Sequence, residues 1–241
     1  MEQLAKQILN SIKIEYKTLT KSSAGFSNAV YFVDDKYVIK IAPDPSRFQK
    51  LANETNFYKL ANFDFVAKLV ASGEYNGYPY LVMEQLHGVT VYSIWHTLTE
   101  QARENLVKQL GNILKNIHTM PYDYLPERKV SHSMLKTMQD SFNLNIDILQ
   151  KRGFDTGFVK KVYDKLPSIF AESKNGLVYN DAHFDYFLLV GDKLYIIDFD
   201  RVRYCSIDYE LMIIKSMLDN PKKFASEKDE DNVEFDQYKN V

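Results

Sequence analysis

Two short apolar segments in the last third of the chain place the tightest limits on its fold. Residues 187–190 and 194–197 are rich in types that favour β-strands, and a polar turn at 191–192 separates them. This pattern predicts a β-hairpin. Asp181 precedes the first segment and Asp198 follows the second. Because a hairpin brings its outer ends together, we expect both carboxylates to face one cleft.

Two neighbouring carboxylates suit the chemistry of phosphoryl transfer. One can act as a base that orients a hydroxyl group, and the other can be a ligand for Mg²⁺. A loop carboxylate, a hairpin and then a metal-binding carboxylate form the local plan of a kinase catalytic loop. We therefore expect Asp181 to be the catalytic residue and Asp198 to be a metal ligand.

The same segment resembles the catalytic core of the aminoglycoside phosphotransferase and choline kinase-like family. Its members carry H-G-D or H-N-D, an Asn five residues after that Asp, a hairpin, and I-D-F or I-D-W. Residues 179–181, Tyr-Asn-Asp, match H-N-D except at the first position, and residues 197–200, Ile-Asp-Phe-Asp, match the metal motif. Tyr186 occupies the place of the Asn, which is a departure from the family. The resemblance covers residues 17–215, most of the chain.

The tyrosine at position 186 leaves the second metal ligand open, because a phenol is a poor Mg²⁺ ligand compared with a carboxylate or amide oxygen. Asp185, the adjacent residue, is our candidate for this ligand after a shift of one residue. Alternatively the enzyme holds one metal firmly, or His183, Asp200 or water fills the place. A further alternative is a protein that binds nucleotide without transferring phosphate.

The first part of the chain predicts a phosphate-binding loop. A small, polar segment at 20–28 separates an expected strand at 14–19 from an expected hairpin at 29–41. Small residues let backbone N–H groups approach phosphate oxygens, so Ser23 and Gly25 are candidate nucleotide contacts. An ordinary hairpin loop is the alternative, since Gly25 is the sole glycine of this loop and the three-glycine pattern is lacking.

Lys40 lies inside an apolar segment, Val-Ile-Lys-Ile, that is expected to be a strand. A lysine with such neighbours either extends to solvent or points into a cleft. The resemblance implies the cleft, because the lysine that binds the α- and β-phosphates belongs on the strand after the phosphate loop. Its expected partner is a glutamate on the next helix, and Glu54 lies near the middle of a helix expected at 47–60.

Two further strands are expected at 65–72 and 78–86. The second of them resembles the family's strand that leads into the hinge between the lobes. This resemblance implies that backbone groups from Glu84 to Leu86 hydrogen-bond the edge of the purine, and that Met83 guards the pocket behind it.

Helical periodicity opens the chain and dominates it after residue 88. Amphipathic helices are expected at 4–12, 98–118, 133–151, 158–171 and 211–218. The expected elements indicate an α+β fold class, and the resemblance implies a two-lobed protein kinase-like fold. Residues 1–86 would form an N-lobe with a five-stranded antiparallel sheet plus a helix, and residues 87–241 would form a mainly helical C-lobe with the catalytic loop, the metal motif and the acceptor site.

Composition limits the function classes. The chain is 45% hydrophobic and 26% charged with a net charge of −2, so it gives no reason to expect nucleic acid as a partner. No apolar run approaches the roughly 18 residues that span a bilayer, so no membrane partner is expected. Cys205 is the single cysteine and cannot form an internal disulfide, which suits a reducing, cytoplasmic setting.

The resemblance implies a phosphotransferase that moves the γ-phosphate of ATP or GTP, with Mg²⁺, to a hydroxyl group of a small molecule. An aminoglycoside-like compound, choline, an amino alcohol and a sugar all stay open as acceptors. An acidic segment at 227–236 is either a wall for a polycationic acceptor or a solvated terminus. A catalytically silent, nucleotide-binding regulatory module is the alternative function. A protein kinase is disfavoured, because only 43 residues follow Asp198 and no A-P-E-type segment is found.

Overall fold

The chain forms two compact units in its computed structural model, which describes residues 1–22, 27–126 and 134–220. The first unit contains Met1–Gly111 and His183–Arg201, and the second contains Asn112–Ala182 and Val202–Asn220. The expected division of the chain between residues 86 and 87 stays a prediction.

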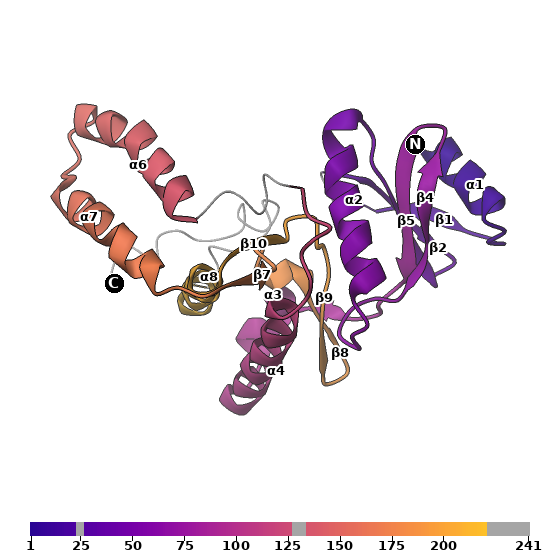
Figure 1. Ribbon diagram of the computed structural model, residues 1–241. Coiled ribbons are helices and arrows are strands. Elements are labelled where there is room, and N and C mark those ends of the chain that lie inside the picture. Colours follow the sequence, from indigo (N-terminus) through magenta and orange to yellow (C-terminus); the bar gives the residue numbers. More distant parts are fainter. Residues whose placement is uncertain (23–26, 127–133, 221–241) are drawn as a thin grey trace. The chain divides into compact units, whose positions relative to one another are not determined.

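A five-stranded antiparallel sheet is the main element of the first unit (Figure 1). The strand order is β1-β2-β3-β5-β4. The strands are β1 (Leu19–Lys21), β2 (Ala29–Val33), β3 (Tyr37–Ile41), β4 (Leu69–Tyr75) and β5 (Tyr78–Glu84). Asn76 and Gly77 have φ angles of 51° and 81° and close the tight turn between β4 and β5. The expected antiparallel sheet is confirmed.

Two helices lie on opposite faces of this sheet, as Figure 1 shows: α1 (Glu2–Ser11) and α2 (Pro45–Leu60). Ile39 and Ile41 are fully buried in a cluster with the apolar side of α1. Side chains alternate along a strand, so Lys40 points to the other face, toward α2. α2 begins where it does because the Asp44 side chain accepts a hydrogen bond from the Ser46 N–H at 2.9 Å.

The strand expected at 14–19 is wrong: the first strand comprises only Leu19–Lys21. Lys17 and Thr18 donate their backbone N–H groups to the carboxylate of Asp34, in the turn between β2 and β3. These donors are therefore used by a side chain and not by a neighbouring strand. Ladder pairing starts at Leu19, which lies opposite Val33.

The strand expected at 65–72 begins later than predicted, at Leu69. The carbonyl of Phe65 instead accepts a hydrogen bond from the N–H of Ile196 at 3.0 Å, so this residue contacts the predicted hairpin.

The predicted hairpin is confirmed as part of a small three-stranded sheet in the first unit, with the order β6-β8-β9. Its strands are β6 (Val89–Thr90), β8 (Phe187–Val190) and β9 (Lys193–Ile196), and Gly191 turns the chain with a φ of 60°. Gly88 approaches β8 closely, since a Cβ atom at this position would lie 2.8 Å from the carbonyl oxygen of Leu189. The strand β6 and the short helices α3 (Val91–Ile94), η1 (Trp95–Thr97) and η2 (Phe184–Tyr186) were not expected.

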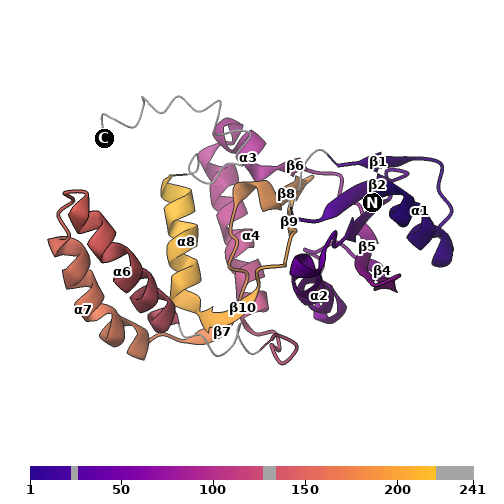
Figure 2. The same ribbon diagram turned by 90° about the horizontal axis from the view of Figure 1, so that it is seen from above.

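Helices make up most of the second unit. Its elements are α6 (Met134–Lys151), α7 (Gly157–Ala171), β7 (Asn175–Val178), β10 (Arg203–Ser206) and α8 (Ile207–Asp219), and α4 (Glu100–His118) contributes its last turns. α6 and α7 lie side by side in both views (Figures 1 and 2). α8 begins at Ile207, ahead of the expected 211, because the Ser206 hydroxyl accepts a hydrogen bond from the Tyr209 N–H at 3.2 Å.

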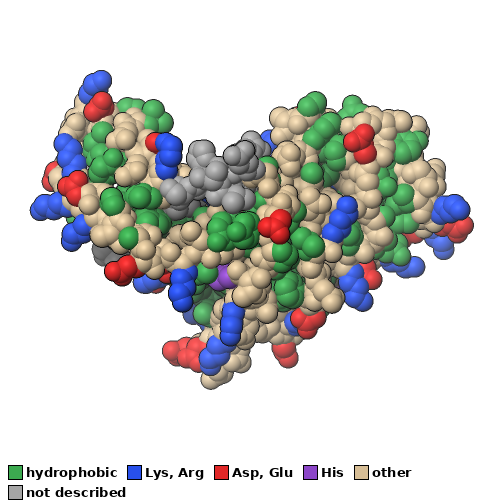
Figure 3. Space-filling view, viewed as in Figure 1, with side chains coloured by type: hydrophobic (Ala, Val, Ile, Leu, Met, Phe, Trp, Pro, Cys, Tyr) green, Lys and Arg blue, Asp and Glu red, His purple; other side chains and the backbone are tan. Residues whose placement is uncertain are grey.

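Charged side chains of both signs are interspersed on the face of the first unit that Figure 3 shows. Within the described residues, no helix has the length and apolar character needed to cross a bilayer.

Candidate functional site

Lys40 is the centre of a three-residue ionic cluster in the first unit. Its Nζ atom donates a hydrogen bond to Glu54 Oε1 at 2.6 Å and lies 3.2 Å from Asp198 Oδ1. β3 contributes the lysine, the middle of α2 contributes the glutamate, and the segment after β9 contributes the aspartate. The expected pair of Lys40 and Glu54 is thus present, and Asp198 joins it.

Burial and neighbouring charges shift the pKa values of this cluster in opposite directions. Burial alone would lower the pKa of Lys40, but attraction by Asp198 and Glu54 outweighs it and holds the pKa well above its usual value. Burial raises the pKa of Glu54 to about 7, against the attraction of Lys40. Glu54 is fully buried, and its second oxygen, Oε2, has no hydrogen-bond partner in the described part of the chain. Lys40 therefore keeps its positive charge, as a phosphate-binding lysine requires.

The aromatic residue of the metal motif fastens this segment to α2. The rings of Phe199 and Phe57 stack with centroids 3.9 Å apart and planes 12° from parallel. Tyr58 meets the same ring edge-on at 5.5 Å. Both residues of α2 lie about one helical turn after Glu54, on the buried side of the helix. The packing that holds Phe199 therefore also fixes the position of Asp198.

The carboxylates after β9 differ in exposure. Asp198 has a φ of 66°, and its side chain is 28% exposed. Asp200 is 6% exposed, and burial, followed by repulsion from Asp198, raises its pKa. Within the described residues, Asp198 Oδ2 has no hydrogen-bond partner. A hard cation such as Mg²⁺ prefers an accessible carboxylate oxygen of this kind, so Asp198 fits the ligand role better than Asp200 does.

The departure at Tyr186 lies in η2. The carbonyl of Tyr186 accepts a hydrogen bond from the Ile197 N–H at 3.0 Å, which joins this residue to the metal motif through the backbone. Asp185 Oδ2 lies 3.3 Å from His183 Nδ1 and accepts no hydrogen bond from the residues that the structure describes. Among the residues that the structure describes, no group of three or more His, Cys, Asp or Glu side chains is arranged to hold a metal. Asp185 fits a metal by its chemistry, and its role as a ligand stays a prediction.

The backbone N–H groups of the hinge segment differ in whether a described residue accepts their hydrogen bond. The N–H groups of Glu84 and Gln85 donate to the carbonyls of Lys68 and Lys36 at 2.9 and 2.7 Å. The described residues offer no hydrogen-bond partner to the N–H of Leu86. Met83 is buried in β5 opposite Val38, on the sheet face that carries Lys40. Of the predicted hinge contacts, Leu86 thus has a free donor and Glu84 has used its own.

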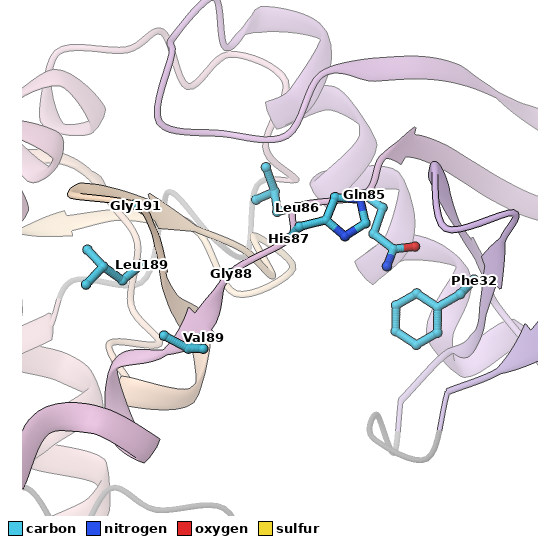
Figure 4. Close-up of a pocket in the computed structure, with 8 residues that line it drawn as sticks. All are labelled: Phe32, Gln85, Leu86, His87, Gly88, Val89, Leu189 and Gly191. Atoms are coloured by element: carbon cyan, nitrogen blue, oxygen red, sulfur yellow. The ribbon is translucent and has the colours of Figure 1, made fainter.

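A cavity of about 710 Å³ lies beside the hinge in the first unit, as Figure 4 shows. Its walls come from β2, the hinge and the small sheet: Phe32, Gln85, Leu86, His87, Gly88, Val89, Leu189 and Gly191. The ring of Phe32 stands on one side of the open space, opposite Val89 and Leu189. A partly apolar concave surface with a free backbone donor is typical of a ligand site. Phe32 was not among the predicted site residues.

The loop with Asp181 belongs to the second unit. Asn180 has a φ of 60°, and its backbone N–H donates a hydrogen bond to Glu210 Oε1 at 2.9 Å. Glu210 Oε2 lies 2.6 Å from His118 Nε2 at the end of α4. Glu210 is fully buried. The role of Glu210 was not predicted.

The signal for Glu210 is present in the sequence. Glu210, Ile214 and Met217 are the buried residues of α8, and their spacing of four and three residues places them on one helix face. A glutamate on the apolar face of a helix indicates that its carboxylate has a buried hydrogen-bond partner. Ser23 and Gly25, the predicted phosphate contacts, lie outside the described residues, as does the acidic segment 227–236.

Comparisons with known proteins give the family. The sequence matches the phosphotransferase enzyme family over residues 18–231, whereas no curated protein sequence matches it. The GDP complex of wild-type aminoglycoside 2'-phosphotransferase-IIIa is 15% identical with a TM-score of 0.69, over 89% of this chain and 77% of that one. The streptomycin–ATP–APH(2")-IIa ternary complex is 17% identical with a TM-score of 0.66, over 88% and 74%. These likenesses confirm the protein kinase-like fold, and the family match means that the chain belongs to the phosphotransferase enzyme family.

Proposed function

We propose that this phosphotransferase moves the γ-phosphate of ATP or GTP to a hydroxyl group of a small molecule. The observation that carries the proposal is Lys40, which contacts both Glu54 and Asp198. A buried lysine held by two carboxylates is a preorganised positive charge, and phosphoryl transfer depends on positioning and charge neutralisation more than on covalent chemistry.

The sheet suggests how a nucleotide lies in the first unit. Phe32 is opposite Val38 in the β2–β3 pairing, and Lys40 is two residues further along β3 on the same face. Phe32 and Lys40 are therefore diagonal neighbours on adjacent strands, roughly 7–8 Å apart. In our proposal the base lies at the cavity against Phe32, with its edge at the Leu86 N–H, and the phosphates extend toward Lys40.

A metal is part of the proposal, because phosphate oxygens need their charge neutralised. Asp198 would hold Mg²⁺ through its accessible carboxylate, with Asp185 as the second candidate ligand. When bound, the ion would neutralise charge on the β- and γ-phosphates. The chain's own part is to hold Asp198 in place, which the stacking of Phe199 on Phe57 supports.

Asp181 is the proposed base. A carboxylate that accepts the proton of the acceptor hydroxyl, or orients that hydroxyl, contributes about 10²–10⁴-fold to the rate. Solved relatives in complex with streptomycin, gentamicin and kanamycin support a polyhydroxylated, amine-bearing acceptor. The silent nucleotide-binding module stays as the second candidate function, because Tyr186 occupies the place of a metal-binding Asn.

The test is a nucleotide-consumption screen. ATP and GTP are each offered with Mg²⁺ or Mn²⁺ across a panel of aminoglycosides, choline, amino alcohols and sugars, and the binding of both nucleotides is measured by calorimetry. We expect acceptor-dependent turnover by the wild type and none above background by Asp181→Asn. Nucleotide binding without acceptor-dependent turnover would favour the silent module, and the absence of any nucleotide binding would contradict both functions.

A further inference from the structure

We propose that the tip of the α6–α7 hairpin, residues 150–162, docks onto the surface of an anionic lipid bilayer. The tip belongs to the second unit, and the inference does not depend on the proposed function. The expectation that the chain has no membrane partner rested on the lack of a spanning segment. A surface contact needs no such segment, because apolar and basic side chains together can hold a protein in the interface between lipid and water.

Large apolar side chains are exposed on this hairpin. Phe158, in the first turn of α7, is 76% exposed, and Phe154, in the turn between the helices, is 61% exposed. The other exposed apolar side chains of the two helices are Leu144, Ile148, Val159, Val162 and Ile169. The sides on which the helices meet are already used, since Phe142 stacks on Tyr163 with ring centroids 4.0 Å apart. A concentration of exposed apolar area of this kind marks a surface that binds a partner.

The turn that carries Phe154 has a defined structure. The Phe154 N–H donates a hydrogen bond to the carbonyl of Leu149 at 3.1 Å, and Gly153 adopts a φ of 82°. The Gln150 side chain donates to the hydroxyl of Thr156 at 3.1 Å, and Thr156 is buried. The backbone of the turn is thus held by its own hydrogen bonds while the ring of Phe154 stays outside. Such preorganisation lowers the entropy that is lost on binding.

The charge of the tip matches an anionic surface. Four exposed basic residues lie next to the two phenylalanines along the chain: Lys151, Arg152, Lys160 and Lys161. The acidic residue of the tip, Asp155, accepts a hydrogen bond from the Gly157 N–H at 2.8 Å. Four positive charges and one negative charge give residues 150–162 a net charge of +3, whereas the whole chain has −2. Figure 3 shows basic side chains beside the apolar ones of this hairpin. Clusters of this kind are attracted to anionic headgroups.

A lipid surface fits the tip better than a protein partner does. The exposed rings belong to phenylalanines, whereas Trp, Tyr and Arg dominate the binding energy of protein interfaces. In Figures 1 and 2 the tip is the end of the hairpin that lies away from β7, so its side chains project from the turn between two helices. A bilayer accepts projecting apolar groups without a matching pocket, and flanking lysines and arginines then reach the headgroups.

The first experiment measures vesicle binding by the full chain without any activity. The protein is sedimented with vesicles of phosphatidylcholine alone and with vesicles that contain about 30% phosphatidylserine. We expect binding to the second kind only, and a loss of about tenfold or more between low and high salt, since salt screens the attraction. Lys160→Gln/Lys161→Gln should weaken binding about 25-fold, roughly fivefold for each charge removed. Phe154→Ser/Phe158→Ser should weaken it about 10–100-fold.

Matched controls change the same residue types at exposed positions outside the tip. Leu60→Ser/Val70→Ser lies in the first unit, and Lys108→Gln/Lys115→Gln lies on α4. Both controls should bind the vesicles as the wild type does. All substituted side chains are exposed, so each variant should keep the circular dichroism spectrum of the wild type. Equal losses in the controls and in the tip variants would overturn the role of the tip.

The second experiment tests whether a ring enters the bilayer. Phe158→Trp places an indole in the tip, and its emission should shift to shorter wavelength with phosphatidylserine vesicles. The wild type should show no shift, because its single tryptophan, Trp95, lies in the first unit. An unshifted emission of vesicle-bound Phe158→Trp would overturn the apolar part of the contact.

Other occupants of the tip give different results. If the wild type binds no vesicles and sediments as a dimer that Phe154→Ser/Phe158→Ser dissociates, a second copy of the chain covers the tip and the proposal is overturned. A monomer that binds no vesicles overturns it as well, and the exposed rings then fit a protein partner. The nucleotide-consumption screen is independent of these measurements, so failure of the proposed function leaves the result on vesicle binding unchanged.

Discussion

Each unit of the molecule contains a fully buried glutamate, and the two are held differently. In the first unit, one oxygen of Glu54 contacts the side chain of Lys40 and the other oxygen has no hydrogen-bond partner among the described residues. In the second unit, one oxygen of Glu210 accepts a backbone N–H and the other contacts His118.

This difference indicates what each glutamate does. Glu54 positions a charged side chain whose other donors are directed at a carboxylate and, in our proposal, at phosphates. Glu210 binds a backbone N–H directly before Asp181, whose side chain is the base in our proposal. We therefore expect changes around Glu54 to alter nucleotide binding, and changes around Glu210 to alter turnover. The predictions below test this separation.

Asp181→Asn should give the largest effect. This substitution should lower turnover and leave nucleotide affinity unchanged. The amide cannot accept the proton of the acceptor hydroxyl, so kcat should fall about 10²–10⁴-fold. Nucleotide affinity, measured by calorimetry, should change less than twofold. A large loss of nucleotide affinity in this variant would contradict the expectation that changes in the catalytic loop alter turnover and leave nucleotide binding unchanged.

Lys40→Ala should weaken the binding of a nucleoside triphosphate by about 10–100-fold, because a hydrogen bond to a charged group is worth roughly 1.5–3 kcal/mol. Binding of the nucleoside, which has no phosphate, should be unaffected. The exposed Lys36, at the edge of the same strand, gives a matched control as Lys36→Ala. Equal losses for nucleoside and triphosphate would contradict a phosphate contact.

Tyr186→Asn should lower the Mg²⁺ concentration needed for half-maximal activity by several-fold, since an amide oxygen is a better ligand than a phenol. Asp185→Ala should raise that concentration, and Tyr186→Asn should rescue it. Metal titration of nucleotide binding gives a second measurement that does not depend on turnover. If neither change alters the metal requirement, the loop does not ligate the metal, and Asp198 is the sole protein ligand left in the proposal.

The last prediction concerns the pH dependence of stability. The pKa of Glu54 is raised to about 7 in the folded chain, above its unfolded value near 4.5, so the folded state binds this proton more tightly. The contribution to stability is complete below pH ~4.5 and is lost as the pH rises toward 7, by at most about 1.4 kcal/mol per pH unit. Urea unfolding of Glu54→Gln should lack this decline. Parallel curves for the variant and the wild type would contradict it.

The sequence predicted the sheet and the hairpin, because each leaves a local pattern such as alternation or a turn. The pair of Lys40 with Glu54 was instead implied by the family resemblance. It did not predict the partners of Glu210, since the glutamate, Asn180 and His118 are far apart along the chain and meet only after β7, α4 and α8 have packed. The strand expected at 14–19 failed for a related reason. A carboxylate in a distant turn, Asp34, takes the N–H groups that a strand would use.

Residues 180 and 198 have a left-handed backbone conformation, which limits the substitutions that these two positions can accept in evolution. Gly and Asn adopt a positive φ at low cost. This accounts for the two forms of the family's loop motif, H-G-D and H-N-D. Position 180 can therefore alternate between two residue types without a change in shape. At position 198, with a φ of 66°, the proposed metal ligand must be an acid that also tolerates this backbone. Aspartate meets both demands, whereas a β-branched residue meets neither. We therefore expect fewer substitutions to be neutral at position 198 than at position 180.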